Sequence, residues 1–214
     1  MDYYSNKISL YEYVNQLRCD RQLSYYNYPL DIVTYCEMRN DIVIDHYSFN
    51  TTGLCGIAML GDKSDTIILN SGRSEREQNF DCGHELIHVT KHRNLGEECF
   101  RCFTTPKENQ NQILEWEANE GSAELLVPYR LFLPKVKAAY NKLRTWRDLK
   151  CLKTDLALEF NVSMAVIYYR LESLKCEIMQ YNNGTPLGQV TLMSQTEQSA
   201  HGVHIRSLND MFHN

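Results

Sequence analysis

The sequence predicts an α+β fold, with a small antiparallel sheet near the N-terminus and helices after it. Three short runs rich in β-branched residues, DIVIDHYSF, LCGIAML and DTIILN, lie between residues 41 and 70, which is typical of strands. From residue 74 onward the apolar residues instead recur at the 3.6-residue spacing of an α-helix. At 214 residues the chain is long enough for one main hydrophobic core.

Two helices are expected before the sheet. In residues 7–18 the apolar side chains recur at three-residue steps, close to the helical period. A second, short helix is expected to start at Pro29. The second and third strands are joined by the turn-like sequence GDKSD, residues 61–65, so these strands are predicted to form a hairpin.

The helix that follows the sheet carries the residues of greatest chemical interest. Ser74 and Glu77 have the spacing of a capping box, and the helix that they open is predicted to run to about His92. A polar loop is expected from about 93 to 109. The next helix is expected over about 111–127.

The C-terminal third of the chain is predicted to contain two helices joined by a turn. The first is expected to open near Thr154, the turn to lie at 160–162, and the second helix to be capped by Ser163. This arrangement is similar to a helix-turn-helix. From Tyr181 on, the chain is polar and contains several glycines, so we expect an extended or poorly ordered tail.

Charge and hydropathy exclude some classes of protein. The formal net charge is −5, which argues against a protein whose main work is to bind phosphate backbones. The first ten residues lack the pattern of an export signal, and no apolar run approaches the roughly 18 residues of a membrane span. We expect a cytoplasmic protein with no membrane partner and no main nucleic-acid partner. Its oligomeric state is not fixed by the sequence.

The cysteines are expected to be reduced thiols. Eight of them are scattered through a chain without an export signal. Only Cys99 and Cys102 form a CxxC motif, and the second pair that a structural zinc ribbon needs is absent. We interpret Cys99 and Cys102 as two small apolar residues of a loop.

Residues 80–92, FDCGHELIHVTKH, contain an HExxH motif. Helical residues four apart share a face, so His84 and His88 are able to reach one metal ion. Glu85 then lies beside the ion without binding it, where it can accept a proton from metal-bound water. Gly83 costs the helix about 1 kcal/mol relative to alanine, so we expect another backbone or a substrate to approach there. Simple surface histidines are the alternative interpretation.

A catalytic zinc normally has three protein ligands, so a third must come from elsewhere. His92 lies two turns from His84, about 12 Å along the helix axis, which is too far to share an ion with it. We interpret His92 as a solvated residue at the helix C-terminus, where the helix dipole favours it.

The next helix offers Glu115 as the third ligand. Glu115 and Asn119 share one stripe beside small residues, so another helix can come close along this face. Asn119 is then placed to hold a ligand imidazole. Glu117 remains the rival for third ligand. Apart from that role, Glu117, Glu120 and Glu124 are expected to be solvated.

These motifs resemble the ImmA/IrrE family of metallopeptidases. The resemblance rests on HELIH at 84–88, EWEAN at 115–119 and AELLVP at 123–128, and it extends over roughly residues 30–175. The sequence departs from the family pattern at Gly121, where members commonly have an aromatic residue, and this departure concerns local packing rather than the metal.

The resemblance implies a zincin-like fold. In such a fold the small antiparallel sheet packs against the HExxH helix and a second ligand helix, and a helix-turn-helix-like segment follows. The corresponding division is a zincin-like metallopeptidase domain at 1–141, a helix-turn-helix-like helical segment at 142–180 and a polar tail at 181–214.

The resemblance also implies a function and its residues. His84, His88 and Glu115 would bind Zn²⁺, and Glu85 would be the catalytic base of a zinc-dependent endopeptidase. The expected partner is a protein substrate, a cytoplasmic helix-turn-helix repressor of transcription, often encoded by a phage or mobile element. The strand at 65–70 comes directly before the metal helix and is expected to bind an extended substrate by edge pairing.

Two other classes of function stay open. The first is a non-catalytic DNA- or regulator-binding module with a structural or degenerate metal site. Its support is the segment 142–176, where seven Lys and Arg against four Asp and Glu give a net charge of +3. The second is an antitoxin-like or scaffold protein without catalysis.

Overall fold

The computed structural model describes residues 6–24, 27–105, 107–108 and 110–212. By its internal contacts the chain divides into two compact units. One unit is the continuous segment 23–126, and the other joins 1–22 to 127–214. Within the described residues, no helix has both the length and the apolar character needed to cross a membrane. The division into peptidase domain, helical segment and tail stays a prediction.

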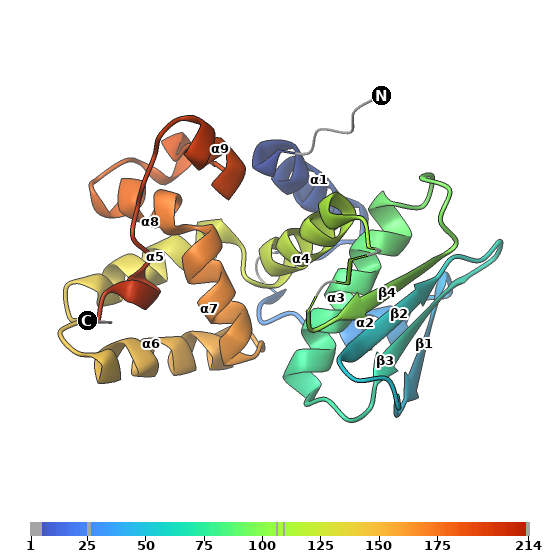
Figure 1. Cartoon of the computed structure of the whole chain (residues 1–214). Coiled ribbons are helices and arrows are strands. Elements are labelled where there is room, and N and C mark those ends of the chain that lie inside the picture. The colour runs from blue at the N-terminus through green and yellow to red at the C-terminus, as the bar shows by residue number, and fades with distance from the viewer. Residues whose placement is uncertain (1–5, 25–26, 106, 109, 213–214) are drawn as a thin grey trace. The chain divides into compact units, whose positions relative to one another are not determined.

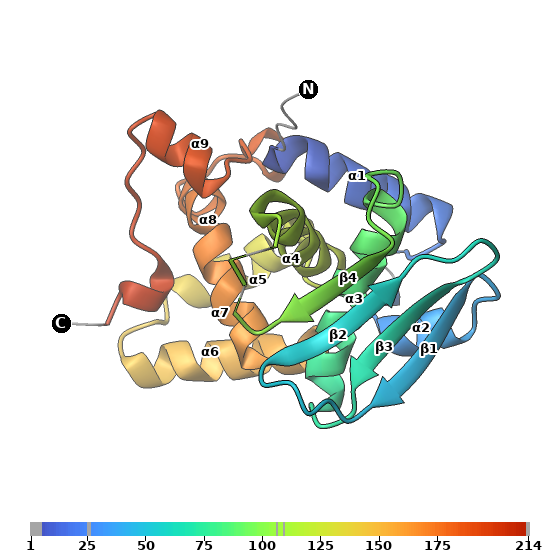
Figure 2. The ribbon, with the colours of Figure 1, turned by 45° about the vertical axis from the view of Figure 1, so that its right-hand side comes forward.

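The unit of residues 23–126 contains the sheet. Its elements are α2 (Ile32–Glu37), β1 (Ile42–Tyr47), β2 (Leu54–Met59), β3 (Asp65–Asn70), α3 (Glu75–Lys91), β4 (Cys99–Phe103) and α4 (Gln112–Leu126). Helices α2 and α3 contact each other and the strands (Figure 1, Figure 2). Helix α3 therefore lies between the sheet and α4, which packs along its other side.

The sheet is mixed, so the prediction of a purely antiparallel sheet is wrong. Among the described residues the strand order is β1-β3-β2-β4. The predicted hairpin of β2 and β3 is antiparallel, but β1 pairs with the other edge of β3 in parallel. The connection at 48–53 carries the chain past β3, which lies between β1 and β2 in the strand order. Because both edges of β3 are occupied, this strand cannot bind a substrate by edge pairing.

Strand β4 lies where the sequence predicts a polar loop. Its five residues pair with β2 in antiparallel fashion, and buried and exposed residues alternate along it. A strand this short, between charged flanks, gives too weak a periodic signal to be distinguished from a loop. Its position at the end of the strand order leaves one edge of β4 without a partner strand in the described part of the sheet.

Helices α3 and α4 form where they are predicted. The capping box at the start of α3 is present, with Ser74 and Glu77 bonded to each other's backbone. The helix ends at Lys91, with His92 as the C-cap. At the start of α4, the side chain of Asn111 accepts a hydrogen bond from the backbone N–H of Ile113 at 3.1 Å. Local capping chemistry thus fixes both helices.

The other unit is helical. Its elements are α1 (Lys7–Asp20), α5 (Tyr129–Tyr140), α6 (Trp146–Glu159), α7 (Met164–Ser173), α8 (Lys175–Asn182) and α9 (Gln195–Ala200), with short 3₁₀ turns at Leu187–Gln189 and Leu208–Asp210. The expected helices at the N-terminus and near Pro29 are both observed, the latter as α2 in the first unit.

The predicted pair of helices in the C-terminal third is present as α6 and α7. The prediction that α6 opens near Thr154 is wrong, because a capping box of Thr145 and Asp148 opens it two turns earlier. The turn lies at the expected place, with Asn161 at φ 52°, and Ser163 is the N-cap of α7. The interpretation of this pair as a helix-turn-helix stays a prediction.

The prediction of an extended or poorly ordered tail is wrong for the described residues beyond Tyr181. The side chain of Gln180 bonds both backbone groups of Thr191, at 2.8 and 2.9 Å. Helix α9 has its own capping box, and Ser207 and Asn209 are buried. Side-chain hydrogen bonds of this kind order a polar segment. Its sequence has no hydrophobic periodicity from which this order could be predicted.

Candidate metal centre

Close contact between α3 and α4 builds the site. A Cβ added to Gly83 would lie 2.5 Å from Oγ of Ser122 on α4, and one added to Gly121 would lie 3.2 Å from the side chain of Ile87. The hydroxyl of Ser122 also donates to the carbonyl of Phe80 at 2.9 Å. A side chain of α4, rather than the expected backbone or substrate, approaches Gly83, and these small residues let the two helices come close.

The structure brings His84, His88 and Glu115 together. The Nε2 atoms of the two histidines are 3.1 Å apart. Glu115 Oε2 lies 3.5 Å from His84 Nε2, and Oε1 lies 3.7 Å from His88 Nε2. Both imidazoles are fully buried, and Glu115 is 8% exposed. Two turns of one helix and the first turn of another thus present three ligand atoms to one point.

The separation of these atoms fits a small tetrahedral cation. A tetrahedral ion that binds its ligands at about 2.0–2.2 Å holds them about 3.3–3.6 Å from one another, which the observed separations bracket. Burial lowers the pKa of His88 well below its ordinary 6.5, and the neighbouring His84 and His92 lower it further. A neutral imidazole with a free lone pair is the form that binds a metal.

The imidazoles of His84 and His88 are each held by a neighbouring side chain outside the ligand cluster. Nδ1 of His84 lies 3.2 Å from Oδ1 of Asn119, as expected from the spacing on α4. The amide nitrogen of Asn119 donates to the carbonyl of Glu115 at 2.9 Å, so its oxygen faces His84. The ring of His88 also stacks on Phe100 of β4, with ring centroids 4.3 Å apart. Both rings are therefore oriented before any ion binds.

The interpretation of His92 as a solvated residue is wrong. His92 is fully buried. Its Nδ1 lies 2.9 Å from Nδ1 of His88, and its Nε2 lies 2.8 Å from Oε2 of Glu117. The spacing of residues 84, 88 and 92 places the three histidines on one face of the helix, but it does not show that this face is buried as far as His92.

The expectation that three glutamates of α4 are solvated is also wrong. Glu117, Glu120 and Glu124 are at most 2% exposed. Glu117 is turned away from the cluster of His84, His88 and Glu115 and pairs instead with Lys91 at 3.0 Å and with His92. The helix is buried on more than one side, which its own sequence periodicity does not show.

Glu85 lies beside the cluster and is completely buried. Neither of its carboxylate oxygens has a hydrogen-bond partner of good geometry among the described residues, although the backbone of Cys102 lies close enough to oppose the rise in its pKa. Burial raises the pKa of Glu85 well above its ordinary 4.5, and the charges of Glu115 and Asp81 raise it further. Gly56 of β2 makes room for this side chain, because a Cβ there would lie 2.8 Å from Glu85 Oε1. A buried carboxyl without partners is expected where a proton has to be moved.

A second group of ligand types lies next to Glu85. Cys55, Asp81 and Cys102 have side-chain atoms within 4.8 Å of one another. Arg73 already neutralises Asp81, with Nε 2.6 Å from Oδ2. Burial nevertheless raises the pKa of Asp81 to about 6, against the opposing effect of Arg73. This group is an electrostatic neighbour of Glu85, whose pKa Asp81 helps to raise.

The CxxC motif does not form a chelating pair. Cys99 and Cys102 are on β4 rather than in the predicted loop, and residues three apart in a strand point to opposite faces. Cys99 is exposed and Cys102 is buried, and both are free thiols. Only Cys102 comes near the candidate centre.

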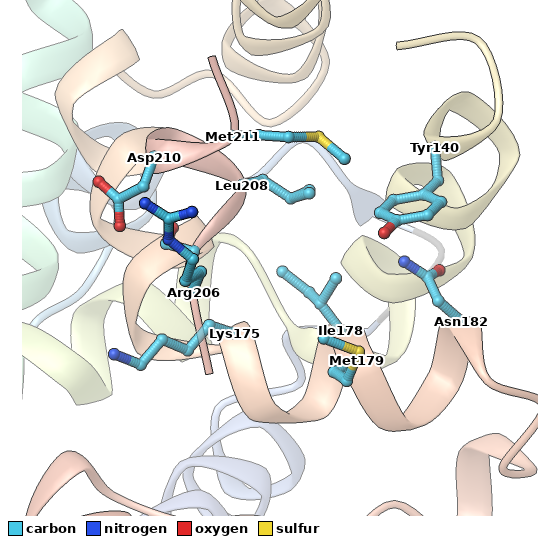
Figure 3. Close-up of a pocket in the computed structure, with 10 residues that line it drawn as sticks. Tyr140, Lys175, Ile178, Met179, Asn182, Arg206, Leu208, Asp210 and Met211 are labelled. Atoms are coloured by element: carbon cyan, nitrogen blue, oxygen red, sulfur yellow. The ribbon is translucent and has the colours of Figure 1, made fainter. Parts of the chain in front are cut away.

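The other unit contains a surface pocket of about 230 Å³. Its lining includes Lys175 and Ile178 of α8 and Leu208 of the last 3₁₀ turn (Figure 3). None of the residues predicted to act in catalysis lies in it. This pocket is therefore separate from the cluster of His84, His88 and Glu115.

Comparison with known families assigns the chain. A family model described as the IrrE N-terminal-like domain, Peptidase M78, matches residues 31–172. The match includes the whole cluster of His84, His88 and Glu115, and Glu85 beside it. Comparison with curated proteins gives no significant match. The chain, matched over about two thirds of its length, belongs to the ImmA/IrrE family of metallopeptidases.

Proposed function

We propose that the protein is a zinc-dependent endopeptidase that cleaves a cytoplasmic protein, a helix-turn-helix repressor of transcription. The observation that carries the proposal is the convergence of His84, His88 and Glu115 on one point, beside an unpartnered Glu85. Histidine and carboxylate ligands in this number are typical of catalytic rather than structural zinc. The repressor as substrate is supported by the resemblance of the sequence to the family.

Each residue of the site has a defined role in this proposal. His84, His88 and Glu115 would hold the zinc ion, and no fourth ligand joins their cluster in the part of the chain that the structure describes. Bound there, zinc would lower the pKa of a water molecule to about 7 and polarise the substrate carbonyl. Glu85 accepts the proton of the attacking water and then gives it to the leaving amine.

The substrate is proposed to bind at the edge of β4 that has no partner strand among the described residues, where it would displace the side chain of Gln110 from the carbonyl of Arg101. This strand is at the end of the sheet, its residue Phe100 stacks on the ligand His88, and its residue Cys102 lies near Glu85. An extended peptide that pairs with β4 would pass beside the metal position. Backbone pairing of this kind requires an unfolded segment, so cleavage is expected in a loop or linker of the repressor.

Metal analysis of two variants tests the ligand assignment. The wild-type protein is expected to bind about one zinc ion per chain, and Glu115→Ala is expected to lose it. Glu117→Ala should still take up zinc at saturating concentration, because Glu117 faces His92 and Lys91 instead of the cluster. Loss of zinc from Glu117→Ala alone would show that the rival assignment of the third ligand is correct. Zinc-loaded wild type is then incubated with a candidate repressor, and uncleaved repressor would contradict the proposed substrate.

The space left by Gly56 provides a second test. Alanine at this position would place Cβ 2.8 Å from Oε1 of Glu85 and displace the carboxylate. We expect Gly56→Ala to retain zinc and to lower kcat about 10- to 100-fold, as small misplacements of reacting groups do. The control is Gly188→Ala, whose Cβ meets no atom within 4 Å. Full activity of Gly56→Ala would show that the position of Glu85 is not critical.

No structural observation favours the alternative of a DNA-binding module. The basic segment 142–176 includes Arg170, which is fully buried and bonded to the carbonyl of Val127 and to Tyr11. Lys150 and Lys153 lie over the rings of Trp146 and Tyr168. Some of the positively charged side chains of this segment thus contact other groups of the protein itself. Binding of the protein to duplex DNA, with an affinity that falls as the salt concentration rises, would support this alternative.

A further inference from the structure

A chain of three buried polar side chains runs away from the metal position. It starts at His88, continues through His92 at an Nδ1–Nδ1 distance of 2.9 Å, and ends at Glu117, 2.8 Å from His92 Nε2. Lys91 closes it with an ion pair to the other oxygen of Glu117 at 3.0 Å. The two histidines are fully buried, and Glu117 is 1% exposed. We refer to His88, His92 and Glu117 as the histidine relay.

Glu117, the last residue of the histidine relay, determines which atoms donate and which accept in its hydrogen bonds. Glu117 is paired with Lys91, so its carboxylate accepts and His92 Nε2 donates. A neutral His92 that is protonated at Nε2 has only a lone pair at Nδ1. His88 must therefore donate from its own Nδ1, which leaves a lone pair at His88 Nε2. That atom is the one that faces His84 and Glu115.

We propose that His92 and Glu117 are positioning residues, which hold His88 in the tautomer with hydrogen on Nδ1 and so keep its Nε2 available to the metal. The inference rests on the proposed role of His88 as a zinc ligand. It assigns a function to two residues that touch neither the ion nor the substrate. The equivalent support for His84 is the bond that its Nδ1 donates to Oδ1 of Asn119, so the two ligands are held by different means.

Packing alone does not explain the histidine relay. Burial of an imidazole and a carboxylate costs free energy unless both are hydrogen-bonded, and an apolar pair of the same size would fill the space without that cost. The stacking of Phe100 on His88 fixes the plane of the ring, but it does not choose which nitrogen carries the hydrogen. The bond to His92 acts on Nδ1 of His88, whereas Nε2 lies 3.1 Å from Nε2 of His84 and faces the metal position.

Zinc affinity of two variants at His92 tests the proposal. His92→Phe keeps the ring volume and removes the acceptor, and we expect it to weaken zinc binding about 10- to 100-fold, the usual effect of losing such a partner. His92→Asn places a carbonyl oxygen near the former Nδ1, so we expect it to recover most of the affinity. The control is Leu86→Ala, a truncation of a fully buried side chain on the same helix. Affinities are measured by competition with a chromophoric chelator.

The tautomer itself is measured on metal-free wild type. Long-range ¹H–¹⁵N spectra of the histidine rings are expected to show hydrogen on Nδ1 of His88, and a mixture of tautomers in His92→Phe. Hydrogen on Nε2 in the wild type would overturn the proposal even if no variant folds. Two other results would also overturn the proposal. One is an unchanged zinc affinity in His92→Phe, and the other is a loss of zinc affinity in Leu86→Ala as large as the loss in His92→Phe. Failure of the wild type to bind zinc at all would instead overturn the proposed function, because the tautomer is observed without metal.

Discussion

Glu85→Gln is expected to abolish cleavage of the substrate while the protein still binds zinc. The glutamine amide has nearly the shape of the carboxyl group and cannot accept the proton of the attacking water. Loss of a general base costs about 10² to 10⁴ in rate, and here the same side chain also returns the proton to the leaving amine. Glu85 does not belong to the cluster of His84, His88 and Glu115, so the zinc content should not change.

The measurement combines cleavage of a repressor with metal analysis of the same sample. A suitable control is Glu75→Gln, the same change at an exposed position in the first turn of α3. Cleavage by Glu85→Gln at the wild-type rate would exclude Glu85 as the base. Loss of zinc together with activity would mean that Glu85 supports the ligands rather than the reaction.

Lys7→Met is expected to lower the free energy of unfolding by about 3–5 kcal/mol, the usual effect of removing one partner of a buried ion pair. Lys7 and Glu177 are 2.8 Å apart, with side chains 1% and 0% exposed. The ammonium group also donates to the carbonyl of Ser173 at 2.5 Å. Methionine fills the volume but leaves the carboxylate of Glu177 buried without a counter-charge.

Chemical denaturation measures this effect, and the chain offers a matched control. Lys135 pairs with Glu159 at the surface, where the side chains are 37% and 50% exposed, so Lys135→Met should cost about 0–1 kcal/mol. The double variant Lys7→Met/Glu177→Leu should recover much of the loss, because it removes both charges. A cost below about 1 kcal/mol for Lys7→Met would show that water reaches Glu177 in the folded state.

The site was predictable where local rules decide the outcome. His84 and His88 share a face because they are four residues apart, and Ser74 and Glu77 fix the start of their helix. The prediction that Glu115 lies close to His84 and His88 required one further inference, which is that small residues let α4 approach α3. The family match supports the same region of the chain.

The features that the sequence did not reveal depend on contacts between distant segments. Strand β1 pairs with β3 rather than with β2, and nothing within either strand specifies the partner. His92 is polar and follows the end of a helix, so a solvated position is the natural expectation. Its burial is caused by α4 and β4, through Glu117 and Phe100. Burial of a polar residue is a property of the assembled fold, not of its neighbours in sequence.

The ion pair between Lys7 and Glu177 has a consequence for the order in which the chain folds. Its two residues are 170 positions apart, and α1 belongs to the same compact unit as residues 127–214. During synthesis on the ribosome, α1 emerges before residues 127–214 and cannot pack against them until they have been made. Proteolytic removal of residues 1–20 should therefore loosen residues 127–214, and spare the segment 23–126 that carries the histidines.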